Sequence, residues 1–112
     1  RQRETRQEGG RVAQQRRLAR ECTVAEQEVG NLLENLMARS WNDTTAERVA
    51  RVEPSAECRR WLSDAQLQVQ IQDESSDVRR IALQLQWRPF AGGRAAPVRL
   101  TAWKFRNAET QR

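Results

Sequence analysis

The residues that could carry chemistry are few in this sequence of 112 residues, which contains two cysteines and no histidine. Without histidine the chain lacks the commonest general base, the Ser–His and Cys–His nucleophile pairs and the usual ligands of a catalytic zinc ion. Carboxylates are available for acid–base work, but all of them suit a solvated helix face: Glu26, Glu28, Glu34 and Glu47. We therefore predict that the protein is not an enzyme and needs no cofactor or metal.

Two interpretations of Cys22 and Cys58 remain open. In an oxidising compartment the two thiols could form a disulfide, which would stabilise the fold by about 2–4 kcal/mol. Alternatively, both are reduced and buried, where a thiol behaves as a small apolar side chain. We favour the reduced pair, because Cys22 lies far along the predicted helix from the segment that carries Cys58.

Positive charge exceeds negative charge, with 20 Lys and Arg residues against 15 Asp and Glu residues and a formal net charge of +5. Many arginines stand at helix spacing from glutamates, as Arg51 does from Glu47, which is typical of a solvated surface of mixed sign. The alternative is a small arginine-rich nucleic-acid-binding module, whose affinity would fall steeply with salt. The arginines assigned to that module are Arg11, Arg16, Arg17, Arg20, Arg80, Arg88 and Arg99.

A long helix over residues 11–40 has to position many of these side chains. Its apolar residues recur at alternating intervals of four and three, the spacing of one stripe along a helix: Leu18, Cys22, Ala25, Val29, Leu32 and Leu36. Such a helix would be about 40 Å long, which exceeds the body that the other residues could build, so part of it should project. The side chains at the start of the stripe are small and suit close approach by another helix. We expect this first part to be fully packed only in an assembly.

The segments on either side of the helix are less regular. Residues 1–10 are polar and include two glycines, which are poor helix formers, so we expect a frayed arm. Residues 41–64 should form short helical and loop segments. Thr44 stands three residues before Glu47 in the form of a capping box, and a second short helix should start near Ser55, after Pro54.

From residue 65 to residue 106 the apolar period changes to two, which predicts a small antiparallel sheet of three or four strands. In the last strand, Val98, Leu100 and Ala102 share one face, while Trp103 and Phe105 share the other. Either a bulge shifts the register there, or both aromatic side chains lie on the outer face and form a patch for a partner. Residues 107–112 should form a tail.

Together these elements predict a single α+β domain over residues 1–112, in which a long N-terminal helix packs on a small antiparallel sheet of three or four strands. This order resembles the periplasmic part of type IV pilin-like proteins. The resemblance rests on the end of the helix, residues 31–41 (NLLENLMARSW), and on the last strand, residues 99–106 (RLTAWKFR). The helix end is most similar to the pseudopilin I class, the minor pseudopilins of type II secretion.

The resemblance implies a non-enzymatic structural subunit of a type II secretion or type IV pilus system. Its domain would lie in the periplasm, held at the inner membrane by a hydrophobic segment that we expect upstream of Arg1. Its partners would be other pilin-like subunits at the tip of a filament, with nucleic acid as a less favoured partner. The expected partner-binding residues are Leu18, Cys22, Ala25, Val29, Trp103 and Phe105. A charge introduced at Ala25 or Val29 should then weaken partner binding and leave the domain folded.

Overall fold

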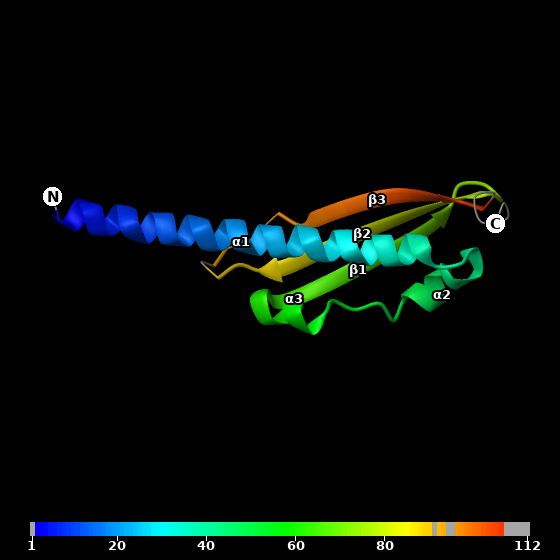
Figure 1. Cartoon of the computed structure of the whole chain (residues 1–112), viewed down its shortest axis with the longest axis horizontal. Coiled ribbons are helices and arrows are strands. Elements are labelled where there is room, and N and C mark those ends of the chain that lie inside the picture. The colour runs from blue at the N-terminus through cyan, green and yellow to red at the C-terminus, as the bar shows by residue number, and fades with distance from the viewer. Residues whose placement is uncertain (1, 91, 94–95, 107–112) are drawn as a thin grey trace.

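A 37-residue helix lies along a three-stranded antiparallel sheet in the computed structural model of the chain (Figure 1). The structure describes residues 2–90, 92–93 and 96–106, and their side chains from residue 12 onward. The elements are α1 (Gln2–Ala38), the 3-10 helix η1 (Trp41–Asp43), α2 (Ala46–Val49), α3 (Ala56–Trp61), β1 (Ser63–Asp73), β2 (Val78–Arg88) and β3 (Val98–Phe105). The predicted α+β arrangement of a long N-terminal helix on a small antiparallel sheet is therefore confirmed.

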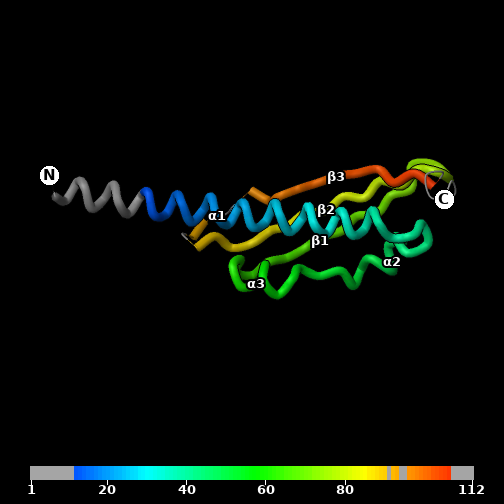
Figure 2. The backbone as a smooth tube through the Cα atoms, viewed as in Figure 1, coloured from blue at the N-terminus to red at the C-terminus, as the bar shows by residue number. Residues whose placement is uncertain are grey.

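The blue part of α1 in Figure 2 begins beyond the end of the sheet. At 1.5 Å per residue the helix is about 55 Å long, and the whole molecule measures 67 × 22 × 21 Å. The helix begins at Gln2, so the expectation of a frayed arm over residues 1–10 is wrong for the described residues of that range. Helix growth from a packed nucleus needs no new nucleation, and the Arg, Gln and Glu residues of this segment favour the helix, which offsets the two glycines.

The sheet has the order β1-β2-β3, and β2 is its central strand. Its antiparallel register pairs Leu85 with Leu67 of β1, and Leu83 with Leu100 of β3. The buried side chains of β2 alternate along the strand and form the middle of the core: Ile81, Leu83, Leu85 and Trp87. Residues of α1 cover this inner face, while the Gln-rich side of β1 points away from the helix and forms an outer face with the alternate residues of β2 and β3.

The register between β2 and β3 is continuous from Val78 opposite Phe105 to Leu85 opposite Val98. No bulge therefore occurs in β3, and the only register shift of the sheet lies near the start of β1. Because alternate residues face opposite sides of a strand, Trp103 and Phe105 lie on the outer face. Of the two alternatives for this strand, the structure has the exposed aromatic pair, whose members are 47% and 55% exposed.

The segment from η1 to α3 runs back alongside β1 and contacts it through α2 and α3 (Figure 1). Thr45 caps α2 by accepting a hydrogen bond from the Arg48 N–H at 3.3 Å, so the prediction of Thr44 as the cap is wrong. Thr44 is buried instead and donates its hydroxyl proton to the carbonyl oxygen of Trp41 at 2.9 Å. Ser55 caps α3, as predicted, by accepting from the Cys58 N–H at 3.1 Å.

Candidate functional site

The described side chains of α1 divide into two stretches. Every side chain from residue 12 to residue 20 is exposed, whereas burial starts at Glu21 and recurs at Ala25, Val29 and Leu36. Two large apolar residues are exposed in the first stretch, Val12 at 43% and Leu18 at 38%. Because the side chains of this stretch are exposed and include these two apolar residues, it is a candidate for contact with another molecule.

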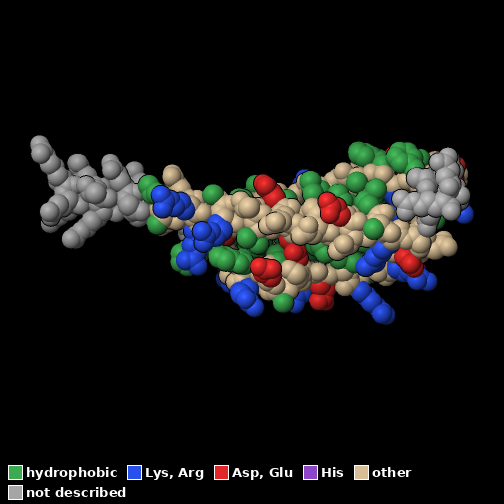
Figure 3. Space-filling model, viewed as in Figure 1, with side chains coloured by type: hydrophobic (Ala, Val, Ile, Leu, Met, Phe, Trp, Pro, Cys, Tyr) green, Lys and Arg blue, Asp and Glu red, His purple; other side chains and the backbone are tan. Residues whose placement is uncertain are grey.

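Two arginines flank the point where α1 leaves the body. The guanidinium carbon of Arg17 lies 3.5 Å from the ring centre of Phe90, and that of Arg20 lies 5.6 Å from the ring of Trp61. Figure 3 shows Lys and Arg side chains gathered around this point. Such contacts between a cation and an aromatic ring are worth about 0.5–1 kcal/mol at exposed sites, so they orient these side chains and add little to stability.

Glu21 marks the boundary between the two stretches. Its side chain is 4% exposed, and its carboxylate oxygens accept hydrogen bonds from the indole Nε1 of Trp87 and from the backbone N–H of Phe90, each at 3.0 Å. These bonds tie α1 to the end of β2. Sequence reasoning missed Glu21, which lies in a polar run. The one available signal was the buried Trp87, whose N–H needs an acceptor.

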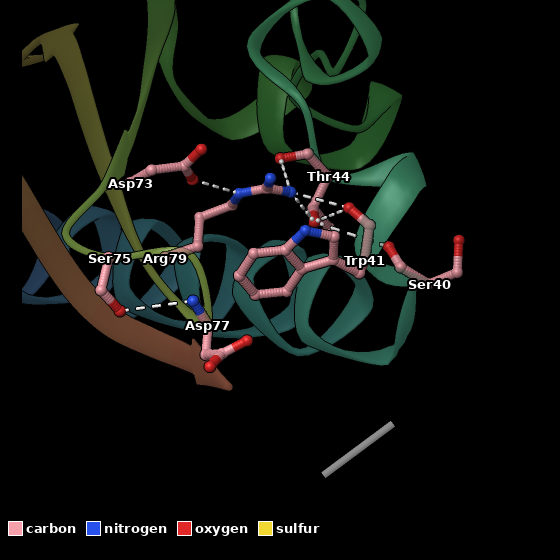
Figure 4. A network of polar contacts seen from close by, with 7 residues as sticks. All are labelled: Ser40, Trp41, Thr44, Asp73, Ser75, Asp77 and Arg79. Atoms are coloured by element: carbon pink, nitrogen blue, oxygen red, sulfur yellow. Dashed lines mark hydrogen bonds and ion pairs between the residues drawn. The ribbon is translucent and has the colours of Figure 1, made fainter. Parts of the chain in front are cut away.

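The C-terminal end of α1 is held by a buried arginine, as Figure 4 shows. The Nη1 group of Arg79 donates to the carbonyl oxygen of Trp41 at 2.7 Å, and to the carbonyl and hydroxyl oxygens of Thr44 at 3.2 and 2.9 Å. Its Nε donates to the Asp73 carboxylate at 2.7 Å, and its guanidinium lies 4.1 Å from the ring centre of Trp41. With its groups so occupied, Arg79 fixes the turn after α1 and is not offered to a ligand.

Lys104 acts on the last turn of α1 itself. Its side chain is 8% exposed, and its ammonium group donates to the carbonyl oxygen of Met37 at 2.6 Å. The last carbonyls of a helix have no partner within the helix and carry partial negative charge, so a cation there is favourable. Lys104 and Arg79 are opposite each other in the sheet. The contacts of Lys104 and Arg79 therefore stabilise the last turn of α1 and the turn that follows it.

The structure places the expected partner-binding residues in two groups. Leu18 and Cys22 on α1, and Trp103 and Phe105 on β3, are exposed. Ala25 and Val29 are 0% exposed and belong to the core, so the expectation that they stay uncovered in the single chain is wrong. Their small side chains let α1 approach the chain's own core closely, which is the close approach that had been attributed to a neighbouring helix.

The arginines of the nucleic-acid alternative do not converge on one surface. Arg16, Arg17 and Arg20 belong to α1, whereas Arg80, Arg88 and Arg99 point to the outer face of the sheet. The side chain of Arg11 lies outside the described part of the chain. Arg88 is paired with Asp64 at 2.6 Å, and the Nε of Arg80 lies 3.8 Å from the Glu74 carboxylate. The described arginines of this alternative are therefore divided between α1 and the sheet.

The cysteines are not bridged: Cys22 is exposed and Cys58 is buried. The prediction of reduced thiols agrees with this structure, but the expected burial of Cys22 is wrong. Burial, aided by the Glu28 carboxylate and opposed by Arg59, raises the pKa of the Cys58 thiol to about 11. Since the thiolate is the reactive form, Cys58 is a poor nucleophile at neutral pH.

Within the described ranges, no group of three or more Cys, Asp or Glu side chains could hold a metal ion. A search of the same residues finds no helix that combines the length and the apolar character needed to cross a bilayer.

No described protein family, no curated protein and no solved structure matches this chain.

Proposed function

We propose that this chain is a non-enzymatic structural subunit of the pilin-like kind, a minor pseudopilin of type II secretion or a related minor pilin. In this proposal, the domain lies in the periplasm and is held at the inner membrane by a hydrophobic segment upstream of Arg1. The single observation that supports the proposal is the division of α1. One unbroken helix is packed on the sheet from Glu21 onward and leaves the side chains of residues 12–20 exposed.

Assembly would bury the exposed stretch of α1 between neighbouring subunits. Leu18 supplies an apolar contact, and Cys22 lies one turn further along the same stripe. Repetition of one helix-to-neighbour contact without closure produces a helical filament. Ala25 and Val29 are not contacts in this proposal, since the chain buries them in its own core. The polar clusters at the two ends of the packed stretch would keep α1 rigid against the body.

The exposed Cys22 offers a direct test in the full-length gene product, expressed in its native host. A maleimide–diazirine reagent attached to Cys22 in membranes should, on irradiation, insert into neighbouring pilin-like subunits, identified by mass spectrometry. The matched control is Cys22→Ser combined with Arg51→Cys, which moves the thiol to an exposed position after α2 and should give no such adduct. Leu18→Glu should abolish the adduct without unfolding the domain. Absence of pilin-like adducts from the wild type would refute the proposal.

A further inference from the structure

The outer face of the sheet differs in composition from the rest of the surface. The strand residues that point to this face include six glutamines: Gln66, Gln68, Gln70, Gln72, Gln84 and Gln86. The ionisable residues among them are Arg80, Arg88 and Arg99, and no outward-pointing residue of the paired register is acidic. Acids beside the face pair with two of these arginines, Glu74 with Arg80 and Asp64 with Arg88, whereas Arg99 makes no ion pair among the described residues. A face with amides and an excess of positive charge is complementary to a polyanion that also offers hydrogen-bonding groups.

Two aromatic side chains share this face with the arginines. Trp103 and Phe105 are two residues apart on the edge strand β3, so their attachment points are about 7 Å apart, and both are about half exposed. Trp103 is opposite Arg80 in the register. Its indole Nε1 donates to the Glu74 carboxylate at 3.3 Å, which fixes the ring by its edge. Exposed rings on a sheet, next to cations, are the groups on which unstacked bases lie in single-strand-binding proteins.

A shallow hollow lies beside this pair. It has a volume of about 140 Å³, and Gln68, Gln70, Gln84, Arg99 and Thr101 are among its lining residues, together with the small Ala82. Ala82 is opposite Gln70 on one side and Thr101 on the other, so its missing side-chain volume creates the hollow between longer polar neighbours. The amide and hydroxyl groups there both donate and accept hydrogen bonds, as the edges of a base require.

We propose that the outer face of the sheet binds a single-stranded nucleic acid, a function beyond the structural role proposed above. Bases stack on Trp103 and Phe105, phosphates lie against Arg80 and Arg99, and a base edge occupies the hollow. Within the described residues Arg99 makes no ion pair, so its charge is available. A rigid duplex keeps its bases stacked on one another and cannot use the aromatic pair, so single strands are preferred.

The test measures the fluorescence anisotropy of a labelled 12-nucleotide single strand titrated with the 112-residue chain. Trp103→Ala and Phe105→Ala should each weaken binding by about tenfold, as base–ring stacking contacts do. Phe90→Ala is the matched control, because Phe90 is 63% exposed at the other end of the molecule and should leave the affinity unchanged. Glu74→Gln removes an acid beside the ring and should strengthen binding a few-fold. Circular dichroism of each variant verifies that it is folded.

Two further ligands distinguish the single strand from other polyanions. The duplex of the same sequence and a poly-glutamate peptide should both bind at least tenfold more weakly at the same salt concentration. Affinity for the single strand should fall as salt rises, and Arg99→Gln should reduce that slope, whereas Arg51→Gln should not. Equal affinity for all three ligands, insensitivity to Trp103→Ala, or no binding at low salt would overturn the proposal. None of these results depends on Leu18, so the proposed assembly role is tested independently.

Discussion

Residues 12–20 and residues 21–38 belong to the same helix, yet only the second stretch is packed against the rest of the chain. The apolar stripe runs through both stretches at the same spacing, from Leu18 to Leu36. What separates them is the length of the body, which ends where Glu21 binds Trp87 and the backbone of Phe90. Periodicity therefore tells which side of a helix is apolar, and the extent of the partner surface decides how much of that side is buried.

The strongest test of this difference between the two stretches of α1 places a carboxylate in each of them. Val29→Glu puts a carboxylate at a position that is 0% exposed, and it should destabilise the domain by about 3–5 kcal/mol. Leu18→Glu, at a position 38% exposed, should change stability by less than about 0.5 kcal/mol. Urea unfolding followed by circular dichroism measures both changes. Equal stability of the two variants would contradict the division of α1.

A second comparison concerns the two arginine environments at the ends of the packed stretch. Arg79→Ala removes the guanidinium donor from the Trp41 and Thr44 carbonyl oxygens and from the Asp73 carboxylate, and should cost about 2–4 kcal/mol. Arg17→Ala, which removes only the contact with Phe90, should cost about 0.5 kcal/mol. Thermal unfolding ranks the two variants. A lower melting temperature for the Arg17 variant than for the Arg79 variant would contradict the larger contribution of Arg79 to stability.

The two thiols provide the mildest test, since Cys22 is exposed and Cys58 is buried. A maleimide at neutral pH should label Cys22 in the native protein, and should label Cys58 only after unfolding. The Cys58 thiol is protonated in both the folded and the unfolded state below pH 9. Between pH 9 and about 11 it ionises only in the unfolded chain, so the free energy of unfolding falls as pH rises. That free energy should fall by about 1–2 kcal/mol over this range. The difference from Cys58→Ala isolates the thiol, because every other ionisable group is common to the two proteins.

The sequence predicted those features that depend on local patterns. The alternation of apolar residues with Gln66 to Gln72 predicted β1, and Ser55 was recognised as a helix start because a hydroxyl there can cap the following turn. Its prediction that Ala25 and Val29 pack on a neighbour is wrong, since small apolar residues suit close packing on the chain's own core equally well. The side on which Trp103 lies was undecided, because only pairing with β2 fixes the register of β3.

The long-range polar contacts could not be predicted from local patterns. Glu28 accepts hydrogen bonds from the backbone N–H and hydroxyl of Ser55, at 2.5 and 3.0 Å, across 27 residues of chain. Arg79 reaches Thr44 across 35 residues. In the sequence these side chains are indistinguishable from the solvated charges of the surface. They become recognisable only when the fold has brought their partners to them.

The position of Lys104 has a practical consequence for anyone who labels this domain. It is the only lysine of the 112 residues, and its amine is enclosed at the end of α1 against the Met37 carbonyl. Succinimidyl esters and other amine-directed dyes therefore meet no accessible lysine on the folded body. Acylation of Lys104 becomes a reporter of unfolding, which mass spectrometry can count molecule by molecule.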